Sequence, residues 1–94
     1  MRSLKWTAPA LQDLEGIDAR LRTEADADAA IRTLPAIRER ADFLLDFPRV
    51  GPLVGDETRS LGVRGTNYNL IYRVLDEERI VIVRIFHASQ DCRP

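Results

Sequence analysis

Apolar residues concentrate in two runs in the last third of the chain, 68–75 and 79–87. Both runs are rich in Val, Ile, Leu, Tyr and Phe, and only Asp76, Glu77 and Glu78 separate them. β-branched and aromatic residues favour extended chain, and two such runs joined by a short polar link are typical of an antiparallel hairpin. Because both faces of each run are largely apolar, we expect this hairpin at the centre of a sheet.

The register of the hairpin decides which side chains share a face. A two-residue turn at 77–78 places Ile71 opposite Arg84 and Arg73 opposite Ile82. The face with the two arginines then also carries Asn69, Ile71 and Phe86. The core face carries Tyr68, Leu70, Tyr72, Val74, Val81, Val83 and Ile85, with His87 at its rim. A three-residue turn would move Arg84 among the tyrosines and Arg73 among the valines, since a one-residue slip inverts the faces. We prefer the two-residue turn because it separates charge from core.

The first half of the chain has a helical period. One apolar stripe comprises Ala10, Leu14, Ile17 and Leu21, and it follows Thr7, a suitable N-cap, and Pro9, which the first turn tolerates. A second stripe comprises Ala27, Ala30, Ile31, Leu34, Ile37, Ala41, Leu44 and Leu45. It continues in phase across Pro35, so we expect one helix that bends at this residue. Two successive helices with a short polar link predict an antiparallel helical hairpin.

The remaining segments complete the expected fold. Leu4 and Trp6 alternate with polar residues and indicate a short first strand. The polar stretch that follows Pro52, up to Glu57, is interpreted as a surface loop. Residues 59–63 are interpreted as a strand that Gly62 makes bulged or edge-like. The order is β-α-α-β-β-β. The sequence therefore predicts an α+β fold with an N-terminal strand, a two-helix hairpin and a three-stranded antiparallel sheet, in one domain over residues 1–94.

Charge and composition narrow the function classes. The net charge is −1, so no global positive field attracts nucleic acid. Thirteen of the fourteen basic residues are arginine, which suits bidentate contacts to carboxylate or phosphate. We interpret Asp13, Glu15 and Asp18 as a solvated helix face and not as a metal site. The single Cys92 has no disulfide or metal-ligand companion, and no cofactor is expected.

No signal peptide or transmembrane run is visible, and we expect a cytoplasmic protein that does not bind membranes. His87 has no acidic or thiol partner close in sequence and is interpreted as structural. Arg73 and Arg84 on one face would repel each other, so we expect an anion beside them, for which solvent ions or Asp91 are candidates.

A set of short motifs extends over nearly the whole chain. In order, they are Trp6-Thr7, Ala10, Asp13-Leu14, Ile17, Phe47-Pro48-x-x-Gly51, Arg59, Tyr68-x-Leu70-Ile71-Tyr72-Arg73-Val74, Val81-x-Val83-x-Ile85-x-His87 and Gln90-Asp91. Their order and spacing resemble the ParE/RelE superfamily, the small toxins of bacterial type II toxin–antitoxin modules. The resemblance implies two antiparallel helices on a twisted antiparallel sheet.

RelE-like members of the superfamily are ribosome-dependent ribonucleases, and RNA cleavage needs a general base, a general acid and cationic stabilisation of the phosphate. The resemblance implies that basic residues would stand at Asn69, around Ser60 and Gly62, and around Gln90. None of these residues is basic, and no tyrosine follows Tyr72. The chain therefore resembles the ParE-like branch, and we expect no catalytic residues and no enzyme.

ParE-like toxins are associated with inhibition of DNA gyrase and are neutralised by ParD-like antitoxins. The resemblance implies the same function and partners here, with no sequence-specific nucleic-acid binding by the chain alone. We expect partner binding, to the antitoxin or the target, by Arg59, Arg64, Arg73, Arg84, Phe86 and His87. Two alternatives stay open: a ribosome-dependent mRNA endonuclease of RelE type, and a toxin-fold protein that has lost toxicity.

Overall fold

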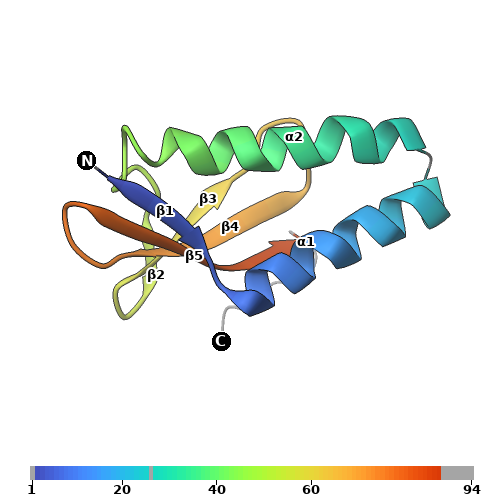
Figure 1. Cartoon of the computed structure of the whole chain (residues 1–94). Helices are drawn as coiled ribbons and strands as arrows, with labels where there is room; N and C mark the ends of the chain where they lie inside the picture. Colours follow the sequence, from blue (N-terminus) through green and yellow to red (C-terminus); the bar gives the residue numbers. More distant parts are fainter. Residues whose placement is uncertain (1, 26, 88–94) are drawn as a thin grey trace.

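The computed structural model describes residues 2–25 and 27–87 and shows two helices packed on one face of a five-stranded sheet (Figure 1). The elements are β1 (Ser3–Trp6), α1 (Ala8–Arg20), the π-helical segment η1 (Leu21–Ala25), α2 (Ala27–Phe43), β2 (Leu53–Gly55), β3 (Thr58–Gly62), β4 (Tyr68–Val74) and β5 (Arg79–His87). The predicted α+β class with an N-terminal strand and a helical hairpin is confirmed, but the predicted three-stranded antiparallel sheet is wrong, because β1 and β2 extend it to five strands.

The strand order in the sheet is β1-β5-β4-β3-β2. β1 is parallel to β5, and the other neighbours are antiparallel. The expectation of a loop up to Glu57 was wrong over Leu53–Gly55, because β2 pairs there with β3, and β3 is consequently not an edge strand. All three residues of β2 are exposed, so this short strand lacks the apolar alternation by which a strand is found in sequence.

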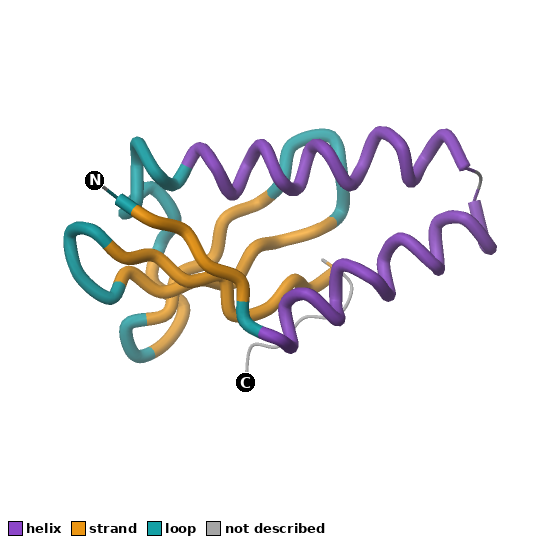
Figure 2. Tube along the Cα trace, in the orientation of Figure 1, coloured by secondary structure: helices purple, strands orange, loops and turns teal. Residues whose placement is uncertain are grey.

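The start of α1 and the continuity of α2 are as the sequence patterns predict. The Thr7 hydroxyl accepts a hydrogen bond from the Ala10 N–H at 3.1 Å and donates one to the Val83 carbonyl at 2.9 Å, so the N-cap also ties α1 to β5. α2 continues through Pro35 as one helix. The short polar link expected between the two helices, Arg22-Thr23-Glu24, is itself helical. Figure 2 shows the two helices side by side as an antiparallel pair. Among the described residues, no helix is long and apolar enough to cross a membrane.

The β4–β5 hairpin combines the two registers that the sequence left open. Near the turn, Arg73 pairs with Val81, as a three-residue turn requires, and the predicted pairing of Arg73 with Ile82 is wrong. Farther along, Ile71 pairs with Arg84 as predicted for the two-residue turn. A register shift at Val83 connects the two halves, at the point where β1 leaves the sheet after its Trp6↔Ile82 pair.

This shift changes which residues of β5 enter the core. Ile80 and Ile82 are buried, whereas Val81 and Val83, which were expected in the core, are only half-buried. Arg73 still lies on the face predicted for it together with Arg84, because Arg84 stands opposite Ile71, two residues away on the same strand. The core itself joins both helices to the strands through Ala10, Leu14, Ile17, Ile37, Ala41, Leu44, Leu61, Val63, Tyr68, Leu70, Tyr72, Ile80, Ile82 and Ile85.

Tyr72 anchors the chain that leaves α2. Its side chain is fully buried, and its hydroxyl oxygen accepts a hydrogen bond from the Gly51 N–H at 3.0 Å. A Cβ on Gly51 would stand 2.5 Å from the Ser60 carbonyl oxygen, so only glycine allows this approach. Arg59 donates to the Gly51 carbonyl at 2.7 Å from the other side. The segment before β2 is therefore fixed to β3 and β4.

Candidate functional site

The sheet has a face that neither helix covers, called here the outer face. The register places on it Ser3, Lys5, Thr58, Ser60, Gly62, Asn69, Ile71, Arg73, Val81, Arg84 and Phe86. Ile71, Val81 and Phe86 are half-buried, so a shallow apolar strip lies between cationic side chains. Half-buried apolar surface next to charge is typical of a surface that a partner covers.

Arg84 is held within the chain by α1. Its Nε and Nη2 donate to the two carboxylate oxygens of Asp13 at 2.7 and 3.0 Å, a bidentate pair. The Ile85 N–H donates to the same carboxylate at 2.9 Å. The guanidinium carbon also lies 5.0 Å from the centre of the Phe86 ring. The interpretation of Asp13 as part of a solvated helix face was therefore wrong, because this carboxylate closes the edge of β5.

The titration of both groups reflects this contact. Burial would raise the pKa of Asp13, but the hydrogen bonds from Arg84 and Ile85, together with the Arg84 charge, outweigh it and lower the pKa below its ordinary value of 3.8. Conversely, the hydrogen bond and the charge of Asp13 raise the pKa of Arg84. The pair therefore stays ionised at neutral pH.

Arg73 has a different anion. Its Nη2 lies 3.3 Å from Glu57 in the turn between β2 and β3, and both side chains are largely exposed. Arg73 and Arg84 thus do not share one anion: each pairs with a carboxylate from another element. Asp91, a candidate for that role, lies outside the described residues.

The other expected partner-binding residues fall in different places. Arg59 lies on the face of the sheet opposite the outer face. There it donates to the carbonyls of Gly51 and Arg49, in the segment before β2. His87 also lies on the core side, and its ring stands edge-on to Tyr68 with 5.1 Å between centroids. Arg64 is exposed in the turn between β3 and β4. Of the six candidates, the outer face brings together Arg73, Arg84 and Phe86, and the other three lie elsewhere.

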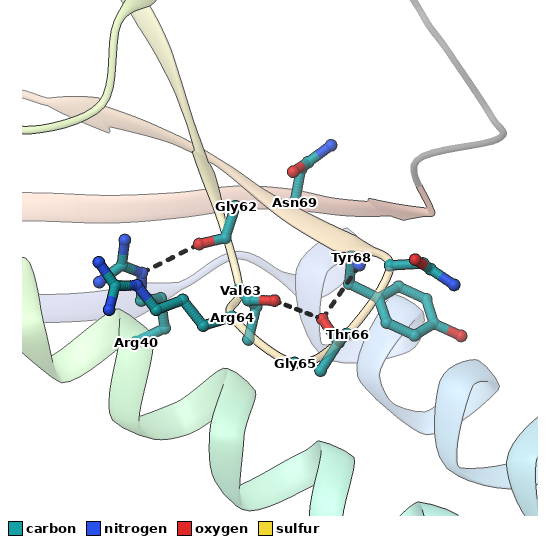
Figure 3. A pocket seen from close by; sticks show the side chains of 9 residues that line it. Arg40, Gly62, Val63, Arg64, Gly65, Thr66, Tyr68 and Asn69 are labelled. Carbon is teal, nitrogen blue, oxygen red and sulfur yellow. Dashed lines mark hydrogen bonds between the residues drawn. The ribbon is translucent and has the colours of Figure 1, made fainter.

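A hollow of about 330 Å³ lies where this turn meets α2 (Figure 3). Arg40 and Arg64 line it from opposite elements, with Asn67 and Asn69. Arg40 was not among the residues predicted from the sequence, although its position in the last turn of a helix, where cations are favoured, is a weak signal. The Arg40 Nε donates to the Gly62 carbonyl at 2.9 Å, which joins α2 to the end of β3.

A second hollow, of about 420 Å³, lies between α1 and the end of β5. Arg20, Arg84 and Phe86 contribute to its walls, and Gly16 lies on its α1 side. A Cβ built on Gly16 would meet nothing within 4 Å, so the helix surface is open there. Two of the expected partner-binding residues, Arg84 and Phe86, therefore border a concave surface.

The positions at which RelE-like ribonucleases carry basic residues are close together in space. Gly62 pairs with Asn69, and Ser60 lies on the same strand and face, two residues before Gly62. None of these groups can supply a cation or exchange a proton near neutral pH. Gln90 lies outside the described residues. In the described part of the chain, no cluster of three or more His, Cys, Asp and Glu side chains could hold a metal ion.

Comparisons with known proteins agree with this fold. The family model of the ParE toxin of the type II toxin-antitoxin system parDE matches residues 4–92. The chromosomal ParDE TA system from P. aeruginosa contains a chain that is 27% identical, with a TM-score of 0.81, and the match covers 93% of this chain and 96% of that one. No curated protein sequence matches.

Two more distant structures show the shared fold alone. The intact E. coli RelBE toxin-antitoxin complex has a chain with a TM-score of 0.65 at 18% identity, over 93% of this chain and 96% of that one. The YoeB/ParE toxin from Agrobacterium tumefaciens has a TM-score of 0.61 at 22% identity, over 93% and 98%.

Proposed function

The chain belongs to the ParE toxin family of type II toxin–antitoxin systems, and on this basis we propose that it arrests growth by inhibiting DNA gyrase and is neutralised by a ParD-like antitoxin. The observation that carries the proposal is the family match over residues 4–92 combined with neutral side chains at the ribonuclease positions Ser60, Gly62 and Asn69. The similar P. aeruginosa chain comes from a ParDE system, which supports the same pairing here.

The outer face supports inhibition by binding and not by catalysis. A ribonuclease needs a proton acceptor, a proton donor and a cation around one phosphate. Here Ser60, Gly62 and Asn69 occupy the corresponding positions, and Arg84, a cation on the same face, already has both donors of its guanidinium fork on Asp13. A macromolecular target that buries the outer face would contact the apolar strip at its centre and the exposed Arg73 side chain at its rim.

A second feature supports an antitoxin partner. Four large apolar side chains between residues 47 and 54 are exposed: Phe47 at 55%, Val50 at 47%, Leu53 at 59% and Val54 at 48%. They lead into the edge strand β2, whose outer backbone groups face no further strand in the described residues. An exposed apolar edge favours pairing with another chain, and a bound antitoxin segment would cover it.

The proposal is tested by induced expression in a bacterial host, with a DNA-damage reporter and protein synthesis followed in parallel. We expect filamentous cells and a damage response before translation falls, and restored growth when a ParD-like antitoxin is co-expressed. The control is Gly51→Leu. Its new side chain would collide with the Ser60 carbonyl and prevent the segment before β2 from folding. Rapid cleavage of mRNA on ribosomes with an undisturbed chromosome would instead support the RelE-type alternative. Normal growth with abundant folded protein would support lost toxicity.

A further inference from the structure

The hollow beside the β3–β4 turn combines two guanidinium groups with no carboxylate. Its lining residues include Arg40 and Arg64 and neither Asp nor Glu. Elsewhere in the described chain, arginines with charged partners are matched one to one, in the pairs Arg22–Asp18, Arg73–Glu57, Arg79–Asp76 and Arg84–Asp13. Arg40 and Arg64 have no such partner among the described residues. Two cations around one concavity repel each other, and an anion placed between them would relieve this.

The donors of the hollow are held in place before any ligand arrives. The Arg40 Nε bond to Gly62 and its position 4.9 Å over the Phe43 ring fix the guanidinium, and its two terminal nitrogens remain available. In Figure 3 the Arg40 and Arg64 side chains extend to the same side of β3. Fixed donors lose little side-chain entropy on binding, so they favour a specific ligand over diffuse counterions.

The turn that carries Arg64 is also rigid. Gly65 has φ of 79°, in the left-handed region. The Thr66 hydroxyl donates to the Val63 carbonyl at 2.8 Å and accepts from the Tyr68 N–H at 3.1 Å, which closes the turn on both sides (Figure 3). The backbone N–H groups of Arg64 and Gly65 donate to no group in the described residues and remain as further donors.

The size and charge of the surroundings favour a single carboxylate over a nucleic acid. A concavity of about 330 Å³ accommodates one side-chain head group. Glu39, directly before Arg40, and Asp42, two residues after it, are exposed on α2 and would repel a continuous phosphate backbone. The net charge of −1 gives no long-range attraction for a polyanion. A planar carboxylate matches the geometry of a guanidinium fork.

We propose that this hollow, which we call the Arg40–Arg64 subsite, binds the carboxylate of one Asp or Glu side chain of the antitoxin. The identity of the partner rests on the proposed function, whereas the carboxylate specificity rests on the hollow itself. Occupation of the subsite would join α2 to the β3–β4 turn and to the antitoxin. It would also bring the ligand next to Gly62 and Asn69 at the rim of the outer face.

The carboxylate specificity can be tested without the antitoxin. Backbone amide resonances of the ¹⁵N-labelled chain would be followed during titration with N-acetyl-glutamate α-amide, with the neutral N-acetyl-glutamine α-amide as the matched probe. We expect the resonances of residues 62–69 to shift only with the charged probe, and the shifts to vanish in Arg64→Ala but to persist in Arg38→Ala, an exposed arginine of α2 that does not line the hollow. No shift in the wild type, or stronger displacement of these resonances by a single-stranded oligonucleotide, overturns the subsite.

The partner is tested by calorimetry with the antitoxin. Arg64→Ala should raise its Kd about tenfold to a hundredfold, the range for a lost charge-assisted hydrogen bond, and Arg38→Ala should leave it unchanged. Equal Kd values for the wild type and Arg64→Ala overturn the antitoxin as ligand while the proposed function stands. Failure of the wild type itself to bind overturns the proposed function, and the resonance titration then still decides whether the hollow binds carboxylates.

Discussion

The Asp13 carboxylate on α1 receives the Arg84 guanidinium of β5 in a bidentate pair, with distances of 2.7 and 3.0 Å. It also accepts the Ile85 N–H at 2.9 Å, beyond the point where β1 stops pairing with β5. One side chain therefore satisfies the backbone of a strand edge and neutralises a cation on the outer face. We expect this pair to stabilise the packing of α1 against the sheet.

Replacing Asp13 by Asn should lower the free energy of unfolding by about 1–2 kcal/mol, because Arg84 loses a charged partner that is only partly shielded from solvent. Urea denaturation of the two proteins measures the difference. Asp18→Asn is the matched control: its partner Arg22 lies one turn away on the same helix surface, and about 0.5 kcal/mol or less is expected. An equal loss in both variants would contradict the special role of Asp13.

The contribution of Asp13 should depend on pH in one direction. Its pKa is lower in the folded chain than the ordinary value of 3.8, so the stabilisation is fully present above that value and is lost as the pH falls through the folded pKa. The difference in unfolding free energy between the wild type and Asp13→Asn should therefore be constant from about pH 5 to about pH 7 and shrink below about pH 3.8. A difference that stays the same in strong acid would show that packing, and not charge, carries the effect.

Tyr72→Phe should destabilise the chain by about 1–2 kcal/mol, because the buried Gly51 N–H loses the hydroxyl that accepts its hydrogen bond. Tyr68→Phe provides the comparison. Tyr68 is also buried, but its hydroxyl makes no hydrogen bond within the described residues, and a change within about 0.5 kcal/mol is expected. Thermal and urea unfolding of both variants would measure these differences, and equal stabilities would contradict the anchoring role of Tyr72.

Gly65→Ala should lower the free energy of unfolding by about 1–2 kcal/mol, because a residue with a side chain is disfavoured at φ of 79°. The added Cβ itself would meet no atom within 4 Å. Gly55→Ala is the matched control. The φ angle of Gly55 is not positive, so a side chain causes no backbone strain there, and its Cβ would also meet no atom within 4 Å. That variant should be neutral or slightly stabilised. If both variants lose the same stability in urea denaturation, the left-handed conformation of the β3–β4 turn is not the cause.

Periodicity and capping were sufficient to predict the helices, the central hairpin and the face shared by Arg73 and Arg84. They could not reveal the extra residue at Val83, because the residues from Ile80 to Val83 are all apolar and no local signal marks the shift, which lies where β1 stops pairing with β5. For this reason Val81 and Val83 were expected in the core where Ile80 and Ile82 are buried.

The candidate site was predicted less completely than the fold. Asp13 and Arg84 are 71 residues apart, and no helical spacing distinguishes Asp13 from Glu15 and Asp18 on the same helix. Arg40 could not be predicted for a related reason: only the approach of the β3–β4 turn to α2 places this arginine beside a hollow. Contacts between distant elements decide these roles, and a single sequence does not record them.

The proposed function requires that the chain act on DNA topology by binding. It is tested most directly by adding the purified chain to DNA gyrase and relaxed plasmid, with the same preparation added to a translating ribosome assay. We expect supercoiling to fall as the chain is added, to recover when the antitoxin is present, and mRNA to remain intact. Unimpaired supercoiling together with cleaved mRNA would contradict the account.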